Sequence, residues 1–228
     1  MCGRYTITVS WDELMMRFLL DGRPGKYQPR YNAAPGQWIP AILGGEPGFG
    51  ERAANRLGEL RWGLVPSWAQ DAKSGARMMN ARAETVAEKP SFRTLLSRKR
   101  CLIPADGFYE WKKTGGGKQP VRFVLKDGGL FGMAALYDTW VGEDGDKLHT
   151  CTIVTTAANG LVAEVHERMP VILTREREKV WLDRSVREQA ELLPLLEPFP
   201  AERMDYYEVR PEVGRVAYDE PDCIRPLA

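Results

Sequence analysis

The stretch Cys-Leu-Ile-Pro-Ala-Asp-Gly-Phe-Tyr-Glu-Trp at 101–111 opens the most strand-like part of the sequence, because apolar and aromatic residues dominate it. Three more strand-like stretches follow, at 121–126, 130–141 and 148–157. Short sequences that favour tight turns separate the four, namely Gly115-Gly116-Gly117, Asp127-Gly128 and Asp144-Gly145. Consecutive strands joined by tight turns pair antiparallel, so this region predicts a sheet-dominated core.

The segments around this region predict further strands and several helices. Residues 3–9 have a strand-like pattern, and Ser10 with Glu13 three residues later predicts the capping box of a following helix. Other strands are expected at 38–43, 60–65 and 170–173, and other helices at 91–98, 159–165, 175–183 and 186–196. The Gly- and Pro-rich stretch 21–36 predicts a loop, and the Gly-rich stretch 44–58 predicts a mobile surface excursion.

These elements predict one domain of the α+β class. Its centre is expected to be mainly antiparallel β-sheet in a distorted, barrel-like arrangement, with the helices around it. A chain of 228 residues is long enough to bury a substantial core. The Gly-rich stretches are too short to act as linkers between domains.

Composition narrows the functional classes. The 32 Lys and Arg balance the 31 Asp and Glu, so an anionic partner has to meet a local basic patch. No run of about 18 apolar residues is present, and the first residues lack the apolar region of a secretory signal, so we expect a cytoplasmic protein without membrane contact. Four widely spaced cysteines and two histidines favour neither a zinc site nor a disulfide framework, so no metal or other cofactor is expected.

Cys2 is a candidate nucleophile. An initiator methionine is normally removed before a small residue, which would leave Cys2 with an α-amine two carbons from its thiol. The amine titrates near ~8 and the thiol near ~8.5, so small shifts populate the nucleophilic forms of both. The thiol could attack an acyl carbon, or amine and thiol could condense with an aldehyde to an imine and then a five-membered thiazolidine. The alternative is a cysteine that stands at position 2 by accident.

Residues 78–85, Met-Met-Asn-Ala-Arg-Ala-Glu-Thr, form a second candidate region. In an extended chain Asn80, Arg82 and Glu84 share one face, and two alanines share the other. Asn offers a donor and an acceptor, and the planar fork of Arg matches phosphate, so the row could hold a sugar-phosphate backbone. The alternative is an exposed edge strand with a cross-strand ion pair.

Two residues are candidates for proton transfer. Glu110 lies between two aromatic residues, so partial burial should raise its pKa toward neutrality. The alternative is that Glu110 points to water while the aromatic rings pack inward. Asp106 competes for the role, but before a glycine it is more simply a turn former. His166 precedes an apolar strand and has an ordinary pKa suited to proton shuttling, although a lone histidine is often structural, and His149 looks incidental.

Arginine and tryptophan recur near these positions, at Arg4, Trp62, Trp68, Arg77 and Arg82. Single-stranded nucleic acid binds by base stacking on aromatic rings and by phosphate contacts with guanidinium groups. The alternative for the tryptophans is ordinary core packing.

Five motifs together resemble the SOS response-associated peptidase (SRAP) family. They are Met-Cys-Gly-Arg-Tyr at the start, Arg-Trp-Gly-Leu-Val-Pro-Ser-Trp at 61–68, Asn-Ala-Arg-Ala-Glu-Thr at 80–85, the stretch at 101–111, and Val-His-Glu-Arg-Met-Pro at 165–170. The match keeps this order over positions 2–170, and the residues after 170 carry no matching motif. The resemblance implies a single SRAP-like domain over 2–228, with Met1 removed by an associated peptidase activity.

The resemblance also implies a protein that forms a covalent crosslink to abasic sites in single-stranded DNA. Cys2 would condense with the ring-opened sugar aldehyde, and the thiazolidine would shield the lesion from strand cleavage. The family's asparagine, glutamate and histidine correspond to Asn80, Glu110 and His166. We assign Glu110 to proton transfer at the amine and aldehyde, His166 to the sugar oxygen and to reversal, and Asn80 to orienting amine and sugar.

The resemblance further implies DNA-backbone contacts by arginines, and the full set of expected DNA-binding residues is Arg4, Trp68, Arg77, Arg82, Trp111 and Thr155. We expect a monomer that associates with the nucleoid when it is bound to DNA. Two other functions stay open: a cysteine peptidase or amidohydrolase in which Cys2 attacks a carbonyl, and a non-catalytic reader of modified DNA. Formation of an SDS-resistant, DNA-dependent adduct would distinguish the crosslinking function from the hydrolase and from the non-catalytic reader.

Overall fold

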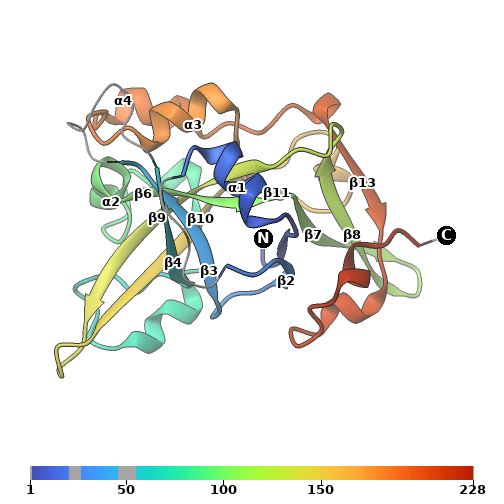
Figure 1. The fold of residues 1–228 in the computed structure, drawn as a ribbon, viewed down its shortest axis with the longest axis horizontal. Helices are drawn as coiled ribbons and strands as arrows, with labels where there is room; N and C mark the ends of the chain where they lie inside the picture. Colours follow the sequence, from blue (N-terminus) through green and yellow to red (C-terminus); the bar gives the residue numbers. More distant parts are fainter. Residues whose placement is uncertain (1, 21–26, 46–54, 228) are drawn as a thin grey trace.

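A computed structural model describes residues 2–20, 27–45 and 55–227 (Figure 1). Its strands are β1 (Tyr5–Ile7), β2 (Arg30–Ala33), β3 (Trp38–Leu43), β4 (Arg56–Trp62), β5 (Asn80–Arg82), β6 (Arg100–Ala105), β7 (Gly107–Thr114), β8 (Gly117–Leu125), β9 (Phe131–Val141), β10 (Lys147–Ala157), β11 (Arg168–Pro170), β12 (Ile172–Leu173) and β13 (Met204–Glu208). Its α-helices are α1 (Trp11–Phe18), α2 (Arg93–Arg98), α3 (Arg175–Leu182) and α4 (Gln189–Leu192).

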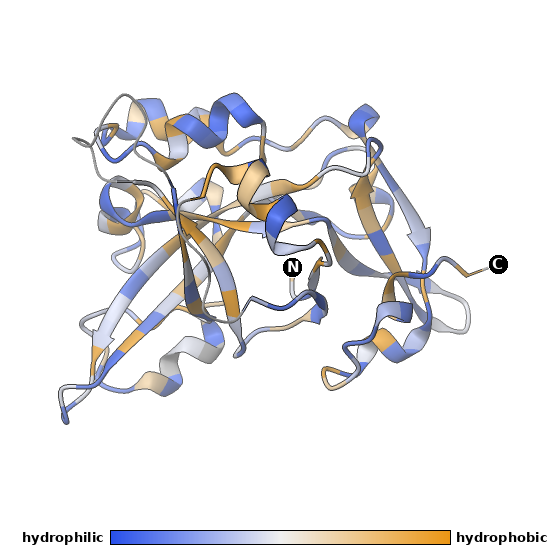
Figure 2. Ribbon diagram, in the orientation of Figure 1, coloured by the Kyte–Doolittle hydropathy of each residue, from blue (hydrophilic) through white to orange (hydrophobic). Residues whose placement is uncertain are grey.

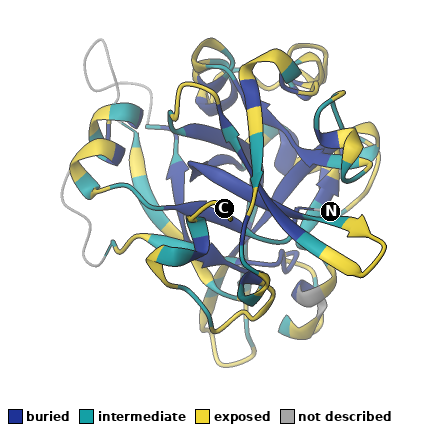
Figure 3. Ribbon diagram, turned by 90° about the vertical axis from the view of Figure 1, so that its right-hand side faces the viewer, coloured by how far each residue is buried: buried dark blue, intermediate teal, exposed yellow. Residues whose placement is uncertain are grey.

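Five strands close into a barrel-like ring. β10 pairs with β4, β4 with β3, β3 with β6, β6 with β9, and β9 again with β10. The β4–β10 pair is parallel and the other four pairs are antiparallel. Most residues of β6, β9 and β10 are buried, and Figure 3 shows the central strands largely in the buried colour while outer turns and helix faces are exposed. The predicted α+β class with a barrel-like, mainly antiparallel core is confirmed.

A second sheet holds the beginning of the chain. Its strand order is β13-β8-β7-β1-β2, and all neighbours are antiparallel. β1 therefore lies inside the sheet, between β7 and β2, although it is the first strand of the chain. In Figure 1 the N-terminus accordingly lies near the middle of the molecule and not at its rim.

The helices lie on the outside and are tied to the sheets by a few buried contacts. The predicted capping box of α1 is confirmed: the Glu13 N–H donates to Ser10 Oγ at 3.3 Å, and the Ser10 N–H donates to Glu13 Oε2 at 2.9 Å. Arg17 of α1 pairs with the buried Glu178 of α3 at 2.8 Å. The outer face of α3 is hydrophilic in Figure 2. None of the helices in the described parts of the chain is long and apolar enough to cross a membrane.

Asp106 joins the barrel to the second sheet. It stands between β6 and β7, and its carboxylate accepts hydrogen bonds from the Thr6 and Thr8 hydroxyls and from the Thr8 N–H, the last at 2.8 Å. Arg122 of β8 pairs with the same carboxylate at 2.9 Å. A Cβ at Gly107 would lie 2.6 Å from the Arg122 side chain, so this packing requires glycine. These contacts fix β1 against the corner where the chain changes sheets.

Most predicted elements are present, with shifted ends, but three predictions are wrong. The stretch 101–111 is not one strand, because β6 and β7 belong to different sheets. The loop predicted at 21–36 contains β2, while 21–26 lie outside the described residues. The strand predicted at 60–65 is present with shifted ends: it is β4, which begins at Arg56 and ends at Trp62, before Gly63 with a φ of 128°. The strand predicted at 170–173 is split into β11 and β12, which pair with β10 and β9.

Two further predictions are met only in part. The helix predicted at 159–165 is a 3-10 turn at Val162–Glu164, and the helix predicted at 186–196 contains the short α4 followed by a 3-10 turn at Leu193–Leu195. The surface excursion predicted at 44–58 is wrong for 56–58, which belong to β4, and residues 46–54 lie outside the described residues.

We expect Asp106→Asn to destabilise the fold strongly. The substitution leaves the buried Arg122 without its carboxylate, and breaking a buried ion pair typically costs about 3–5 kcal/mol. Urea unfolding measures the loss. Asp144→Asn, in the exposed β9–β10 turn, is the matched control and should change the free energy of unfolding by less than about 0.5 kcal/mol. Equal effects of the two substitutions would show that Asp106 does not hold the corner.

Candidate active site

Cys2 lies just before β1, in a stretch of chain that runs alongside β7. The β1–β7 pairing extends to Arg4, whose carbonyl accepts a hydrogen bond from the Tyr109 N–H at 3.0 Å. Cys2 is fully buried. Its burial, followed by the negative charge of Glu110, raises the pKa of its thiol well above the ordinary value. The thiol is therefore protonated at neutral pH while Met1 is attached. The expectation for the α-amine and thiol that loss of Met1 would free stays a prediction.

Glu110 of β7 is close enough to Cys2 for its charge to act on the thiol. The Glu110 side chain is buried, with 4% of its surface exposed. Burial raises its pKa to about 7, and the positive charge of the amino terminus opposes this rise. The predicted rise toward neutrality is confirmed, and the alternative in which Glu110 points to water is wrong. A carboxyl group that titrates near pH 7 can both accept and donate a proton at neutral pH.

Asn80 begins β5, which pairs in parallel with the end of β10. Its side-chain Oδ1 and Nδ2 are both buried, and neither has a hydrogen-bond partner among the described residues. Leaving such a group unsatisfied costs about 1–3 kcal/mol, and a ligand that supplies a donor and an acceptor would remove this cost. The Asn80 amide is therefore a ready binding group.

Trp62 links β5 to the N-terminal strand. Its indole N–H donates to the Met79 carbonyl at 2.9 Å, directly before Asn80. Its ring meets the Tyr5 ring edge-on, with centroids 5.6 Å apart. Trp62 is 1% exposed, so the alternative of core packing is correct for this tryptophan. Its buried ring connects the element that carries Asn80 to the strand that follows Cys2.

The polar row predicted over Asn80, Arg82 and Glu84 ends at Arg82. β5 stops there, and Ala83–Thr85 form a 3-10 turn that takes Glu84 out of the row. Glu84 instead pairs with Arg168 of β11 at 2.6 Å, and this contact lowers the pKa of Glu84. The ion pair considered in the alternative interpretation thus exists, but it joins the turn after β5 to β11.

His166 precedes β11 and is partly buried. Its Nδ1 faces the backbone of Arg168, 3.0 Å from the amide nitrogen and 3.3 Å from the carbonyl oxygen. Burial, followed by the positive charge of the amino terminus, lowers the pKa of His166 below its ordinary value. The ring is therefore neutral at neutral pH. The positive charge of the amino terminus is thus among the causes that act on the pKa values of both Glu110 and His166.

Arg4 uses part of its donor capacity inside the protein. Its guanidinium donates to Asn32 Oδ1 at 3.1 Å and to the carbonyls of Val213 and Gly214 at 2.8 and 3.2 Å. It also lies over the Trp111 ring, 5.9 Å from the centroid. These contacts connect the residues that follow Cys2 to the C-terminal part of the chain.

Asn32 is a supporting residue that the sequence interpretation missed. It is fully buried in β2, and its Nδ2 donates to the carbonyls of Val213, Arg215 and Tyr218 at 3.0, 3.1 and 2.7 Å. Its N–H donates to Asp219 at 2.8 Å. This network holds residues 213–219 against the strand beside β1. The only local signal was a polar Asn in an otherwise strand-like stretch, because its partners lie far away in the sequence.

The other predicted DNA-binding residues differ in accessibility. Trp68 is 64% exposed, and Arg77 and Arg82 are exposed, so all three can meet a ligand. Trp111 is half-buried against Arg4. Thr155 is 1% exposed, and its carbonyl accepts a hydrogen bond from Arg168 at 2.7 Å. DNA contacts by these residues stay predictions.

The chemical groups of the site are a thiol, a carboxyl group, an imidazole and an amide. Across the described residues, no three His, Cys, Asp or Glu side chains gather as metal ligands would. A thiol is a nucleophile, and a carboxyl group and an imidazole are the usual groups of acid–base catalysis.

Comparison with known proteins assigns the family. The family model of SOS response associated peptidase (SRAP) matches residues 1–216. Abasic site processing protein YoqW of Bacillus subtilis (strain 168) is 46% identical over 227 residues, which cover 98% of this chain and 99% of that protein. Abasic site processing protein HMCES of Gallus gallus is 33% identical over 231 residues, which cover 90% and 68%. The chain belongs to the SRAP family, as its motifs predicted.

A solved structure supports the fold independently. The crystal structure of a protein from Bacteroides thetaiotaomicron aligns with a TM-score of 0.88 and 28% sequence identity, and the alignment covers 100% of both chains. The barrel-like ring and the second sheet are therefore features that this chain shares with an experimentally determined structure.

Glu110→Gln should stabilise the protein at alkaline pH and not at acidic pH. The folded-state pKa of about 7 lies above the ordinary value of 4.5, so the folded protein binds an extra proton between these values. Stability therefore falls as the pH rises through this window, and above it the charged carboxylate costs about 3 kcal/mol. Urea unfolding at about pH 4 and about pH 8 measures the difference.

Glu59→Gln is the control for this comparison, because Glu59 is an exposed residue of β4. Its effect on stability should be small at both pH values. A Glu110→Gln effect of the same size at both pH values would contradict the raised pKa of Glu110.

Proposed function

We propose that this protein forms a covalent crosslink to abasic sites in single-stranded DNA through the α-amine and thiol of Cys2. The observation that carries the proposal is the buried carboxyl group of Glu110, whose pKa is raised to about 7 beside Cys2. Condensation of an amine with an aldehyde needs a group that takes a proton from the amine and returns one to the departing hydroxyl. The names of the abasic site processing proteins from Bacillus subtilis and Gallus gallus support DNA with this lesion as the substrate.

Removal of Met1 is a necessary part of the proposal. While Met1 is attached, the Cys2 nitrogen is an amide, which is neither basic nor nucleophilic. Its removal by the protein's own peptidase activity would be consistent with the family description. The released α-amine has an ordinary pKa near ~8, so a neutral fraction is present at physiological pH.

The reaction balances with the loss of one water. The α-amine adds to the aldehyde carbon of the ring-opened sugar, and the carbinolamine loses its hydroxyl with one proton as water to form an imine. The thiol then adds across the carbon–nitrogen double bond, so that sulfur bonds to carbon and the thiol proton moves to nitrogen. The five-membered thiazolidine that results leaves no free aldehyde to promote strand cleavage.

The buried thiol favours an order in which the amine reacts first. A thiol with a pKa well above its ordinary range is a poor nucleophile toward the aldehyde itself. Once the imine has formed, it is protonated easily, and its carbon becomes a much stronger electrophile held next to the sulfur. Proximity then compensates for the low thiolate fraction.

Glu110, Asn80 and His166 take separate roles in this scheme. Glu110 accepts the proton of the ammonium group and donates one to the carbinolamine hydroxyl. Asn80, whose amide atoms have no partner among the described residues, orients the amine through Oδ1 and the sugar through Nδ2. His166 donates a hydrogen bond from Nε2–H to the sugar ring oxygen and so favours the open aldehyde; the same contact assists reversal.

The substrate strand is bound mainly through its backbone. The exposed side chains of Arg77, Arg82 and Trp68 supply two phosphate contacts and one stacking surface. A missing base lowers the cost of kinking the strand into the site. We expect the protein to act as a monomer, with affinity that falls with salt and depends little on sequence.

An SDS-resistant adduct tests this function. Incubation of the purified protein with a single-stranded oligonucleotide that holds one abasic site should give a complex whose intact mass is the sum of both components minus one water. Cys2→Ala, and a form that retains Met1, should give none, whereas Cys223→Ala should react normally. Peptide turnover without DNA and without an adduct would instead identify a cysteine hydrolase.

The rate of crosslinking should depend on the protonation of Glu110. The wild-type rate should rise as the pH passes about 7, because Glu110 then becomes the carboxylate that accepts the ammonium proton. Glu110→Gln should lower the rate by roughly 10²-fold and remove this titration, since general acid–base groups contribute about 10²–10⁴. Glu59→Gln is the control. An unchanged pH profile in Glu110→Gln would overturn this role.

A further inference from the structure

One end of the barrel carries arginines that the crosslinking site does not use. Arg56 begins β4, Arg98 ends α2, and Arg184 and Arg187 follow α3; we call these four residues the arginine cluster. All four are exposed. The whole chain balances 32 Lys and Arg against 31 Asp and Glu, so the cluster is a local excess of positive charge.

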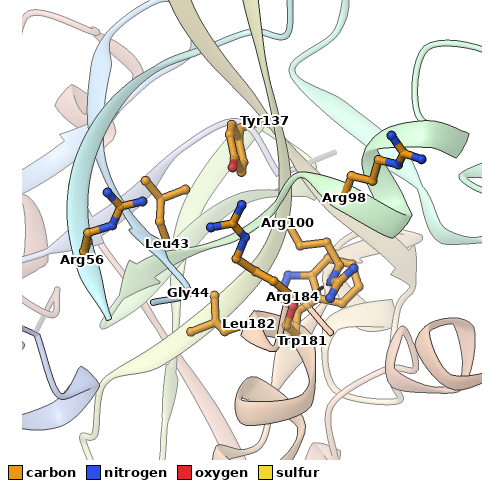
Figure 4. A pocket seen from close by; sticks show the side chains of 9 residues that line it. All are labelled: Leu43, Gly44, Arg56, Arg98, Arg100, Tyr137, Trp181, Leu182 and Arg184. Carbon is orange, nitrogen blue, oxygen red and sulfur yellow. Dashed lines mark hydrogen bonds between the residues drawn. The ribbon is translucent and has the colours of Figure 1, made fainter. Parts of the chain in front are cut away.

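Three adjoining hollows connect the cluster, and Arg184 lines all of them. Figure 4 shows one hollow, in which Arg56 and Arg184 extend their guanidinium groups toward a common space beside Tyr137, while Arg98 points outward. The next hollow, of ≈ 340 Å³, is lined by Arg98, Lys99, Tyr137, Arg184 and Arg187. The cluster therefore forms a continuous, grooved basic surface.

Arg100 builds the platform beneath this surface. It is buried, and its guanidinium donates to four backbone carbonyls, those of Trp181, Leu96, Asp183 and Val186, at 2.7, 2.9, 2.5 and 2.8 Å. These carbonyls come from α2, from the end of α3 and from the segment after it, so Arg100 fixes Arg98 and Arg184 relative to each other. Burial lowers the pKa of Arg100 to about 10, which keeps it charged at neutral pH.

Ion pairing differs among the basic residues of this surface. Three of its members form no ion pair with any described residue: Arg56, Arg98 and Arg187. The neighbouring Lys99 is different, because it pairs with Asp138 at 2.7 Å. The carboxylate of Asp183 accepts the N–H and the hydroxyl of Ser185, at 2.8 and 2.6 Å. Among the described residues, the guanidinium groups of Arg56, Arg98 and Arg187 therefore face solvent without an ion-pair partner and can meet an anionic ligand.

β4 connects the cluster to the candidate active site. The strand runs for seven residues from Arg56 to Trp62, and the Trp62 ring contacts Tyr5 next to the N-terminal stretch. At about 3.3 Å per residue, the two ends are about 20 Å apart. One DNA strand advances about 3.4 Å per nucleotide in duplex geometry, so this separation corresponds to about six nucleotides.

We propose that the arginine cluster is a second nucleic-acid contact, which binds backbone phosphates several nucleotides away from the abasic site. The inference rests on the proposed function only in placing the abasic site at Cys2. The binding of phosphates by the arginine cluster does not depend on that function. Guanidinium forks match phosphate oxygens, and the partly exposed Tyr137 adds a hydroxyl donor and an aromatic face. A second contact of this kind adds affinity for long strands without taking part in the reaction.

Phosphate fits this surface better than an acidic protein does. A protein interface normally has a central apolar or aromatic anchor that excludes water, with charges at its rim. The apolar residues that line the hollow of Figure 4 include Trp181 and Leu182, which are buried, so the exposed surface is mainly guanidinium groups. Such a surface suits a polyanion whose charges repeat along its length.

DNA binding by a charge-reversed variant tests the proposal. Arg98→Glu combined with Arg184→Glu is compared with Lys118→Glu combined with Lys126→Glu, which changes the net charge equally at exposed positions of other elements. Fluorescence anisotropy with undamaged single strands of about 25 and about 5 nucleotides gives the affinities at several salt concentrations. The arginine variant should bind the long strand at least about 10-fold more weakly and the short strand as the wild type does.

The salt dependence gives the second readout. Loss of two phosphate contacts should reduce the slope of log K against log salt by about 1.4 for a single strand, at about 0.7 per contact. Crosslinking of a short abasic strand should be unchanged. The proposal of a second contact would be overturned if both double variants weakened binding of the long strand equally. It would also be overturned if the arginine variant kept the wild-type salt slope for the long strand.

Two controls distinguish the loss of a phosphate contact from misfolding of the variants and from an effect of the introduced negative charge. Thermal unfolding checks the folding of the variants, and Arg98→Gln with Arg187→Gln repeats the test without charge reversal. A wild type that binds undamaged DNA but forms no covalent adduct would contradict the proposed function alone, because the cluster is judged by the binding of undamaged strands.

Discussion

The pairing of β1 with β7 is the constraint on which the rest of the structure depends. The first strand of the chain lies inside a sheet formed by much later residues, and Asp106 holds it at the corner between the two sheets through Thr6, Thr8 and Arg122. β1 cannot shift without breaking these buried contacts. The short stretch before β1, which contains Cys2, is therefore held in place with it. Cys2 is therefore a core residue as well as the candidate nucleophile.

The same burial sets the chemistry of the site. It raises the pKa of Glu110 to about 7 and that of the Cys2 thiol well above its ordinary value, and it lowers the pKa of His166. A carboxyl group poised for proton transfer thus stands beside a thiol that is unreactive by itself. This combination favours chemistry that starts at the α-amine and uses the thiol only to close the ring, and it disfavours direct attack by a thiolate on a peptide bond.

Local patterns predicted what depends on neighbours in the sequence, and they missed what depends on distant partners. The aromatic residues around Glu110 indicated its burial, and the capping box indicated the start of α1. Asp106 looked like a simple turn former because Arg122 and the two threonines lie far from it in the chain. The Asn32 network and the arginine cluster were missed for the same reason, since each joins segments that only the fold brings together.

The most direct test of the central claim is mass spectrometry of the digested adduct. After nuclease and protease treatment, the account predicts an N-terminal peptide that begins at Cys2, carries the sugar remnant with the loss of one water, and resists both alkylation of its thiol and reduction by borohydride. An adduct on a lysine, or a modified Cys2 whose thiol is still alkylated, would contradict a thiazolidine that uses both the amine and the sulfur of Cys2.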